Sequence, residues 1–152
     1  MMRSLDRQDC RAELRRRLRT LRPDSRARWG RMTAHQMVGH LADACRMALG
    51  EKPVTPRRGW IPPLVVKWVA LYLPLAWPAG IPTLPELDQE CAGTRPADFT
   101  VDLARAETLL EVLANRSDAT WPSHPIFGRM SHADWLRWGY LHTAHHLRQF
   151  GA

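Results

Sequence analysis

Cysteine is scarce in this sequence, and its positions form neither a disulfide pattern nor a metal-binding one. Cys10, Cys45 and Cys91 lie far apart, and none of them belongs to a CxxC or CxxH motif. An odd number of isolated cysteines argues against a disulfide framework and against a cysteine-based zinc site. We therefore expect a reducing, cytoplasmic location, and the N-terminus, which carries no apolar signal segment, agrees with it.

Long apolar runs are nearly absent as well, and the one candidate lies between Ile61 and Gly80. It reads IPPLVVKWVALYLPLAWPAG, which is about long enough to cross a bilayer. Lys67 lies inside the run, and Pro74 and Pro78 interrupt it. The sequence therefore favours a shorter, buried core helix and no membrane span.

Lysine is rare, because Lys52 and Lys67 are the only two among 22 basic residues. Residues 1–31 hold 11 arginines against four acidic residues, which accounts for the whole net charge of +7. Such a segment could contact nucleic acid or anionic lipid. It has no interleaved aromatic residues and no nucleic-acid-reading motif, so a solvated arginine face is favoured over nucleic-acid binding.

What the sequence does contain is helical periodicity, without a convincing strand or internal repeat. Its 152 residues suit a single domain, 1–152, that is large enough to bury a core. We expect an all-α bundle with helices over 5–21, from Thr33 to Gly50, from Pro62–Pro63 through Tyr72, over 100–115 and over 131–150. Thr33 with Gln36, and Ser131 with Asp134, form capping-box patterns that mark two of the helix starts.

The segment from Pro53 to Pro96 contains nine of the twelve prolines. The helix inside it is apolar nearly all round, which predicts that both of its sides are covered. Residues 77–98 form a long proline-rich connection, and loops of this length are usually functional or disordered. With Trp77, Ile81 and Leu84, this one is expected to pack down as a rim over the site.

Three histidines form the candidate metal site. His142 and His146 are four residues apart and therefore share one face of the last helix, and His40 lies on the apolar stripe of an earlier helix. Three core-facing imidazoles each need a polar partner, and each unsatisfied buried group costs about 1–3 kcal/mol. A divalent cation would satisfy all three, whereas a hydrogen-bonded core histidine is the ordinary alternative at each position taken alone. Zinc, nickel, iron and copper all suit imidazole, and nothing in the sequence chooses among them.

Other polar residues near these helices have weaker roles. Asp43 and Gln149 are candidates for contacts behind the ligands, although a solvated position is preferred for Asp43. His145 points about 100° away from His146, which favours a supporting contact or a surface position. Cys45 is expected to be a buried, inert thiol, and His124 and His132 are structural or solvent-facing.

Three segments carry a resemblance to a known family: WGRMTAHQMVGHLADACRMALG, WPAGIPTLPELD and HPIFGRMSHADWLRWGYLHTAHHLRQFG. Together they resemble the DinB/YfiT-like superfamily, in particular a functionally uncharacterised bacterial branch, over residues 29–150. The resemblance implies a four-helix bundle with an additional N-terminal or connecting helix, often dimeric, and a metal held by His40, His142 and His146. Many relatives read HHRGQ where this chain reads HHLRQ, which keeps the ligand spacing but changes the polar residues of the pocket.

The same resemblance supplies two hypotheses about function. Characterised relatives include metal-dependent transferases and isomerases that use low-molecular-weight thiols such as bacillithiol or mycothiol, and proteins described as hydrolases. The first hypothesis is therefore a metal-dependent enzyme, a thiol S-transferase or hydrolase acting on a small molecule. The alternative is a non-catalytic binding or stress-response module that the metal stabilises. No residue in the sequence is a secure general base.

Overall fold

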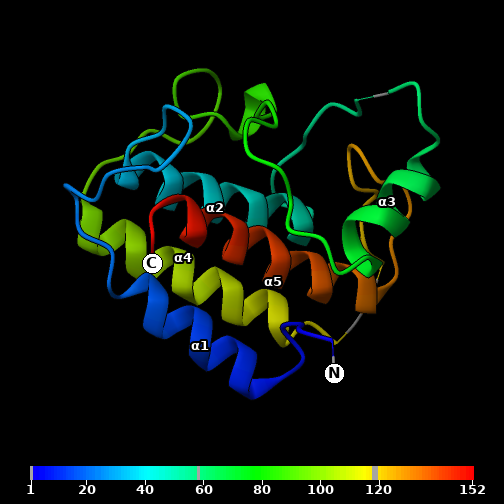
Figure 1. The fold of residues 1–152 in the computed structure, drawn as a ribbon, viewed down its shortest axis with the longest axis horizontal. Helices are drawn as coiled ribbons and strands as arrows, with labels where there is room; N and C mark the ends of the chain where they lie inside the picture. Colours follow the sequence, from blue (N-terminus) through cyan, green and yellow to red (C-terminus); the bar gives the residue numbers. More distant parts are fainter. Residues whose placement is uncertain (1, 58, 118–119) are drawn as a thin grey trace.

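The computed structural model describes residues 2–57, 59–117 and 120–152, and within them the chain is all-helical, with no β-strand (Figure 1). This confirms the all-α class predicted from the sequence. The elements in chain order are α1 (Gln8–Leu18), α2 (Ala34–Leu49), α3 (Pro63–Tyr72), the short 3-10 helix η1 (Pro85–Leu87), α4 (Phe99–Ala114) and α5 (His132–Gln149).

The two helices that carry the candidate ligands begin where the capping boxes predict. Thr33 accepts a hydrogen bond from the backbone of Gln36, whose side chain bonds back to the Thr33 backbone, and α2 follows. Ser131 and Asp134 make the same reciprocal pair at the start of α5. Gly50 ends α2 with a positive φ of 80°, a conformation that favours glycine. These local signals fix where each helix starts, and hence which residues of α2 and α5 face each other.

The first helix is shorter than the predicted 5–21. Leu5 and Leu21 are buried, but both lie outside α1. The backbone N–H of Leu5 donates to the carbonyl of Leu136 in α5, so this residue is held by a tertiary contact and not by helical bonding. The predicted bounds therefore include buried residues at both ends that lie outside the helix itself.

The arginines of α1 are largely engaged in ion pairs. Arg15 lies 2.5 Å from a carboxylate oxygen of Glu111, and Arg19 lies 3.0 Å from Glu107, both on α4. Arg17 pairs with Glu13 within α1 at 3.2 Å. The solvated arginine face favoured from the sequence is thus incomplete as a description, because part of this charge pairs with carboxylates of α4.

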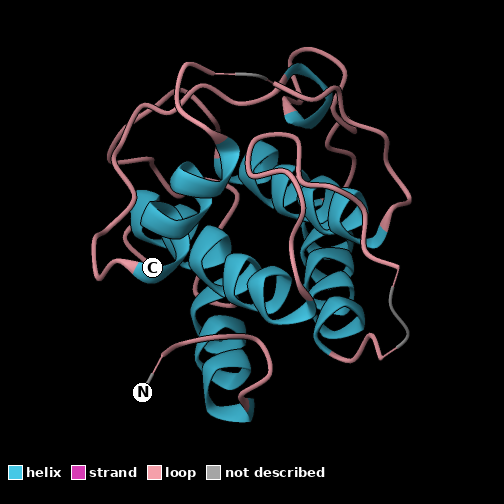
Figure 2. Ribbon diagram, turned by 90° about the vertical axis from the view of Figure 1, so that its right-hand side faces the viewer, coloured by secondary structure: helices cyan, strands magenta, loops and turns pink. Residues whose placement is uncertain are grey.

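The core lies between α1, α2, α4 and α5, which run alongside one another (Figures 1 and 2). Its largest fully buried side chain is Trp135 of α5. Leu14 of α1, Leu41 of α2 and Leu113 of α4 are buried around the same core. Ala106 and Leu110 of α4 are buried as well, whereas Leu103 is only partly buried.

Helix α3 departs most from expectation. Leu71 is its one buried residue, and most of its apolar side chains are exposed, so the prediction that both sides are covered is wrong. Among the described helices α3 packs against α5 alone. Asp134 of α5 accepts hydrogen bonds from the Tyr72 hydroxyl at 2.5 Å and from Lys67 Nζ at 3.0 Å. Arg137 of α5 also donates to the Leu71 carbonyl.

The 73–98 segment connects α3 to α4 and contains η1. Leu84 and Leu87 are buried, but Ile81 is exposed. The expectation that this segment packs down is therefore wrong at Ile81. The Trp77 indole N–H donates to the carbonyl of Ala70 at 2.8 Å, which fixes the start of the segment to α3. In the described parts of the chain, no helix is sufficiently long and apolar to cross a membrane.

Adjacent positions on α4 provide a test of this packing. Leu113 is fully buried, whereas Val112 beside it is 48% exposed. We expect Leu113→Ala to lower the free energy of unfolding by about 2–5 kcal/mol, because it removes buried methyl groups and leaves a cavity. Val112→Ala should change it by less than about 0.5 kcal/mol. Urea unfolding measures both, and equal effects would contradict the core described above.

Candidate metal centre

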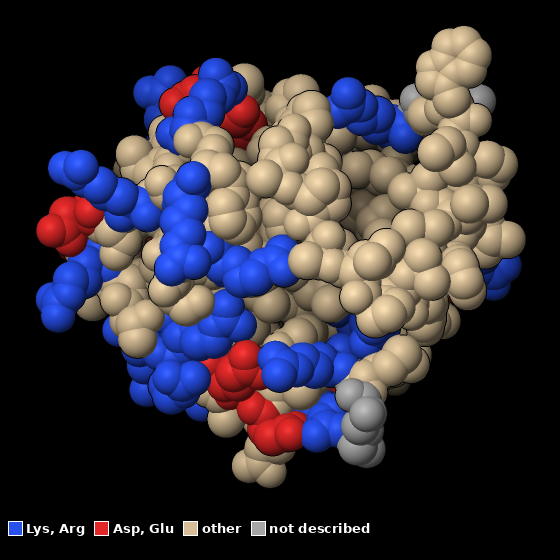
Figure 3. Space-filling view, viewed as in Figure 1, with Lys and Arg blue, Asp and Glu red and all other residues tan. Residues whose placement is uncertain are grey.

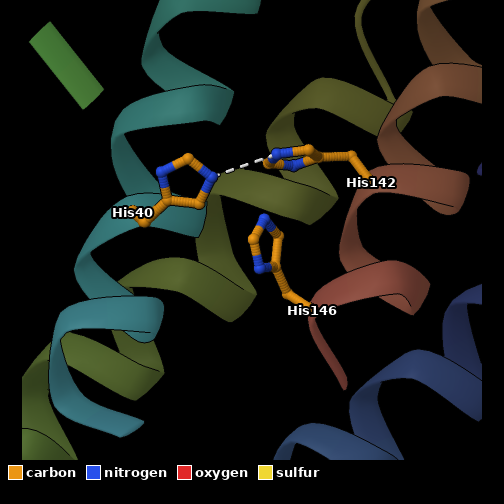
Figure 4. Close-up of side chains that lie close together, drawn as sticks. All are labelled: His40, His142 and His146. Atoms are coloured by element: carbon orange, nitrogen blue, oxygen red, sulfur yellow. Dashed lines mark hydrogen bonds between the residues drawn. The ribbon is translucent and has the colours of Figure 1, made fainter. Parts of the chain in front are cut away.

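The imidazole rings of His40, His142 and His146 point toward one another between α2 and α5 (Figure 4). His40 Nε2 lies 3.1 Å from His142 Nε2. The ring centroids are 5.0 Å apart for His40 and His142, 4.6 Å for His40 and His146, and 4.8 Å for His142 and His146. The structure therefore brings together the three histidines that the sequence nominated.

A backbone hydrogen bond fixes the tautomer of His40. Its Nδ1 lies 2.8 Å from the carbonyl oxygen of Leu87, and a carbonyl only accepts, so Nδ1 carries the proton. The ring is buried and burial lowers its pKa, so it is neutral near pH 7. Its Nε2 is then unprotonated and carries a lone pair, which faces His142 and His146.

Gln149 fixes His146 in the same way. The Gln149 side-chain amide donates from Nε2 to the carbonyl of Trp29 at 2.8 Å, which orients its Oε1 toward His146. The His146 Nδ1 lies 2.8 Å from that oxygen and must donate to it. The Nε2 of His146 is therefore a second unprotonated nitrogen with a lone pair. The supporting role considered for Gln149 has a direct geometric basis, in which the glutamine of the HHLRQ sequence orients His146.

Two lone pairs that face one small space need a hydrogen-bond donor or a cation as partner. Burial lowers the pKa values of His142 and His146 well below the usual range, and the neighbouring imidazoles lower them further. Adding a proton to the cluster is thus unfavourable near neutral pH. A divalent cation satisfies the same nitrogens without placing like charges next to one another.

The donor set fits a borderline-soft divalent metal. The candidate ligand atoms all lie within 4.8 Å of one another. Tetrahedral zinc–imidazole bonds of about 2.0–2.1 Å would separate the nitrogens by roughly 3.3 Å. The Nε2 atoms of His40 and His142 lie 3.1 Å apart, close to that separation. Three protein ligands leave further coordination positions for water or substrate, which is typical of catalytic zinc sites and not of structural ones.

Asp43 is fully buried, so the solvated position preferred from the sequence is wrong. Its carboxylate accepts hydrogen bonds from the Thr94 backbone N–H at 2.7 Å, the Thr94 hydroxyl at 2.8 Å and Gln89 Nε2 at 3.2 Å. Burial alone would raise the pKa of Asp43, but the Thr94 bonds together with Lys52 and Arg46 hold it below its usual value. Asp43 thereby anchors the segment whose Leu87 carbonyl orients His40.

His145 is buried, so its surface interpretation is wrong and its supporting one is retained. Its ring lies 5.1 Å from that of His146, and its Nδ1 accepts a hydrogen bond from Arg148 at 3.2 Å. Burial, with the Arg148 charge, lowers the pKa of His145 to about 4. His145 is therefore neutral near pH 7, with Nδ1 already engaged.

The remaining candidates are structural. His124 is buried, and its Nδ1 accepts the backbone N–H groups of Ile126 at 3.1 Å and Phe127 at 3.2 Å. Burial lowers the pKa of His124 to about 3 and raises that of Cys45 to about 12, so Cys45 is the inert thiol expected. His132 is exposed at the first turn of α5.

The orienting role of Gln149 can be tested by substitution. Gln149→Leu removes the acceptor for His146 Nδ1–H and frees the ring to rotate or change tautomer. Loss of such a contact behind a metal-bound histidine costs about 10–100-fold in metal affinity. Zinc titration by calorimetry should show this loss for Gln149→Leu. The same change at exposed Gln8 on α1 is the control, and an unchanged affinity in Gln149→Leu would contradict the assigned role.

Metal retention should also depend on pH. The pKa values of His40, His142 and His146 lie below the ordinary value of about 6.5, so the folded site takes up protons only at lower pH. Below about pH 6.5 the unfolded chain binds more protons than the folded one, so the free energy of unfolding decreases as the pH is lowered. Elemental analysis after dialysis should show full metal content at pH 7 and loss with a midpoint below 6.5. Content that stays constant down to pH 4 would contradict an all-histidine site.

Comparison with known proteins shows the family without assigning a function. No curated protein and no solved structure matches this chain. Residues 2–152 match the family described as Protein of unknown function (DUF1569), which covers all five α-helices and the three converging histidines. The chain belongs to the DUF1569 family.

Proposed function

We propose that this protein is a divalent-metal-dependent enzyme acting on a small molecule, with His40, His142 and His146 as the metal ligands. The observation that carries the proposal is the pair of fixed tautomers, which aims the Nε2 lone pairs of His40 and His146 into one space. Burial of the imidazoles and the small number of protein ligands support an open, reactive site and not a closed structural one. Free cysteines, two of them buried, fit the cytoplasmic setting.

We further propose a relationship to the DinB/YfiT-like superfamily. Helices α1, α2, α4 and α5 would be its four-helix bundle, with α3 as the additional connecting helix and the 73–98 segment as the long loop. One histidine from an early helix and a His-x-x-x-His pair from the last support this assignment. A homodimer and a low-molecular-weight thiol co-substrate are further expectations of the same relationship.

The chain's own residues would hold and orient the reacting groups. Leu87 and Gln149 keep Nδ1 of His40 and His146 protonated, so that both Nε2 atoms are available. A divalent cation, when bound, would supply Lewis-acid chemistry that lowers the pKa of a coordinated water or thiol, the requirement that thiol transfer and hydrolysis share. Asp43 is engaged with Thr94, and Nδ1 of His145 with Arg148, which assigns neither of them a general-base role.

The histidine ligand can be tested against a second histidine of the same helix. His146→Ala should lose the bound metal, whereas His132→Ala at the exposed start of α5 should retain it. At a free zinc concentration about 100 times Kd, the wild-type protein gains about 2.7 kcal/mol, or roughly 5–10 °C in Tm. Elemental analysis of untagged protein and thermal unfolding measure both quantities. Full metal content in His146→Ala would contradict the proposed ligand set.

Catalysis is distinguished from a stabilising role by the same variant. If the protein is an enzyme, His146→Ala loses both the metal and turnover of an electrophilic test substrate with thiol, or of an ester substrate. If the protein is a binding module, the wild-type protein shows no turnover, and His146→Ala loses only metal and stability. That second outcome would reject the enzymatic proposal and support the alternative.

A further inference from the structure

A cavity of about 470 Å³ opens directly onto the three histidines. Its walls include Val65 and Val69 of α3, Leu84 of the 73–98 segment, Phe127 and Trp138. None of the described residues that line it is Asp, Glu, Lys or Arg. Apart from histidines, two tryptophans and Thr83, every lining side chain is apolar. This volume is within the range of about 300–1,000 Å³ that is usual for small-molecule sites.

A second cleft of about 330 Å³ adjoins the first, and the two share Ile81, Pro82, Thr83, His145 and His146. Charged and amide side chains line it, among them Arg31, Asp88 and Glu90. Charged side chains thus lie on the side of the candidate metal centre that faces the second cleft, and none lines the first cavity among the described residues. A polar group has suitable partners in the second cleft, and the first cavity offers such a group little besides imidazole.

The walls of the apolar cavity are partly open to water. Val65 is 48% exposed, Val69 is 41% exposed and Ile81 is 53% exposed, and all three line the cavity. The surface over α3 is nearly free of charged side chains and is hollowed beside that helix (Figure 3). Covering such apolar area is favourable in proportion to its extent. An apolar molecule seated there would remove exposed surface that the fold itself leaves uncovered.

We propose that this cavity, the apolar chamber, binds the apolar body of a ligand whose metal-coordinating head reaches His40, His142 and His146. The ligand class is an uncharged aliphatic or aromatic molecule carrying one polar head group. The head-group part of this inference rests on the proposed metal centre. Binding of the body depends only on the chamber.

A homologous series of ligands tests the proposal. The affinities of n-alkyl hydroxamates with increasing chain length are measured by calorimetry on the zinc-loaded, full-length protein. Each added methylene should tighten binding by about fourfold until the chamber is filled. Hydroxamates of equal length that end in a carboxylate should lose this gain. Affinity independent of chain length in the zinc-loaded protein would overturn the proposal.

The metal-free protein separates this inference from the proposed function. An n-alkanol series should show the same dependence on chain length without zinc. If zinc fails to bind but the alkanols show that dependence, the metal centre is wrong and the chamber is supported. If zinc binds but neither series depends on length, the chamber is wrong and the metal centre stands.

Two variants of α3 provide the matched comparison. Val69→Asp places a charge on the chamber wall, and Leu64→Asp places one on the same helix at a residue that is 70% exposed and does not line the chamber. Both positions are partly or largely exposed, so neither change disturbs the core. Val69→Asp should reduce the gain per methylene to less than twofold, and Leu64→Asp should leave it near fourfold. An equal gain in affinity per methylene in the two variants would overturn the assignment of Val69 to the chamber wall.

Discussion

The candidate metal centre depends on which imidazole nitrogens carry the protons. The neutral imidazoles of His40 and His146 each donate their one N–H to a partner outside the cluster. His40 donates to the Leu87 carbonyl, and His146 donates to the Gln149 amide oxygen. Their remaining nitrogens therefore face inward as lone pairs, where burial disfavours the uptake of another proton. Without a cation, His142 can donate its own Nε2–H toward the Nε2 of His40 across 3.1 Å.

Much of the surrounding fold maintains this arrangement. Asp43 lies one turn beyond His40 on α2 and holds Thr94 and Gln89, so the helix that carries the ligand also fixes the segment that orients it. Gln149 does the same at the end of α5, because it joins His146 to the Trp29 backbone. Each orienting contact is therefore anchored to a different element, and the rings are held from two directions.

Local sequence patterns predicted the parts of the fold that local interactions determine. Capping boxes located the starts of α2 and α5, and the four-residue spacing placed His142 and His146 on one face. The buried state of Asp43 could not be predicted, since its partners lie 46 and 51 positions away in the chain. The exposure of α3 was missed for a related reason: periodicity identifies an apolar helix, but it does not show whether another element is available to cover it.

The attachment of α3 has a mechanical consequence for the ligand-bearing helix. Asp134 closes the first turn of α5 through Ser131 and is also the carboxylate to which Tyr72 and Lys67 of α3 are bonded. The wall of the apolar cavity and the first turn of α5 are thus both bonded to Asp134, alongside the contacts of Arg137 with the Leu71 carbonyl and of Lys67 with the Arg129 carbonyl. A displacement of α3 would act on the carboxylate that also caps the N-terminus of α5. The width of the cavity and the position of the first turn of α5 therefore depend on each other.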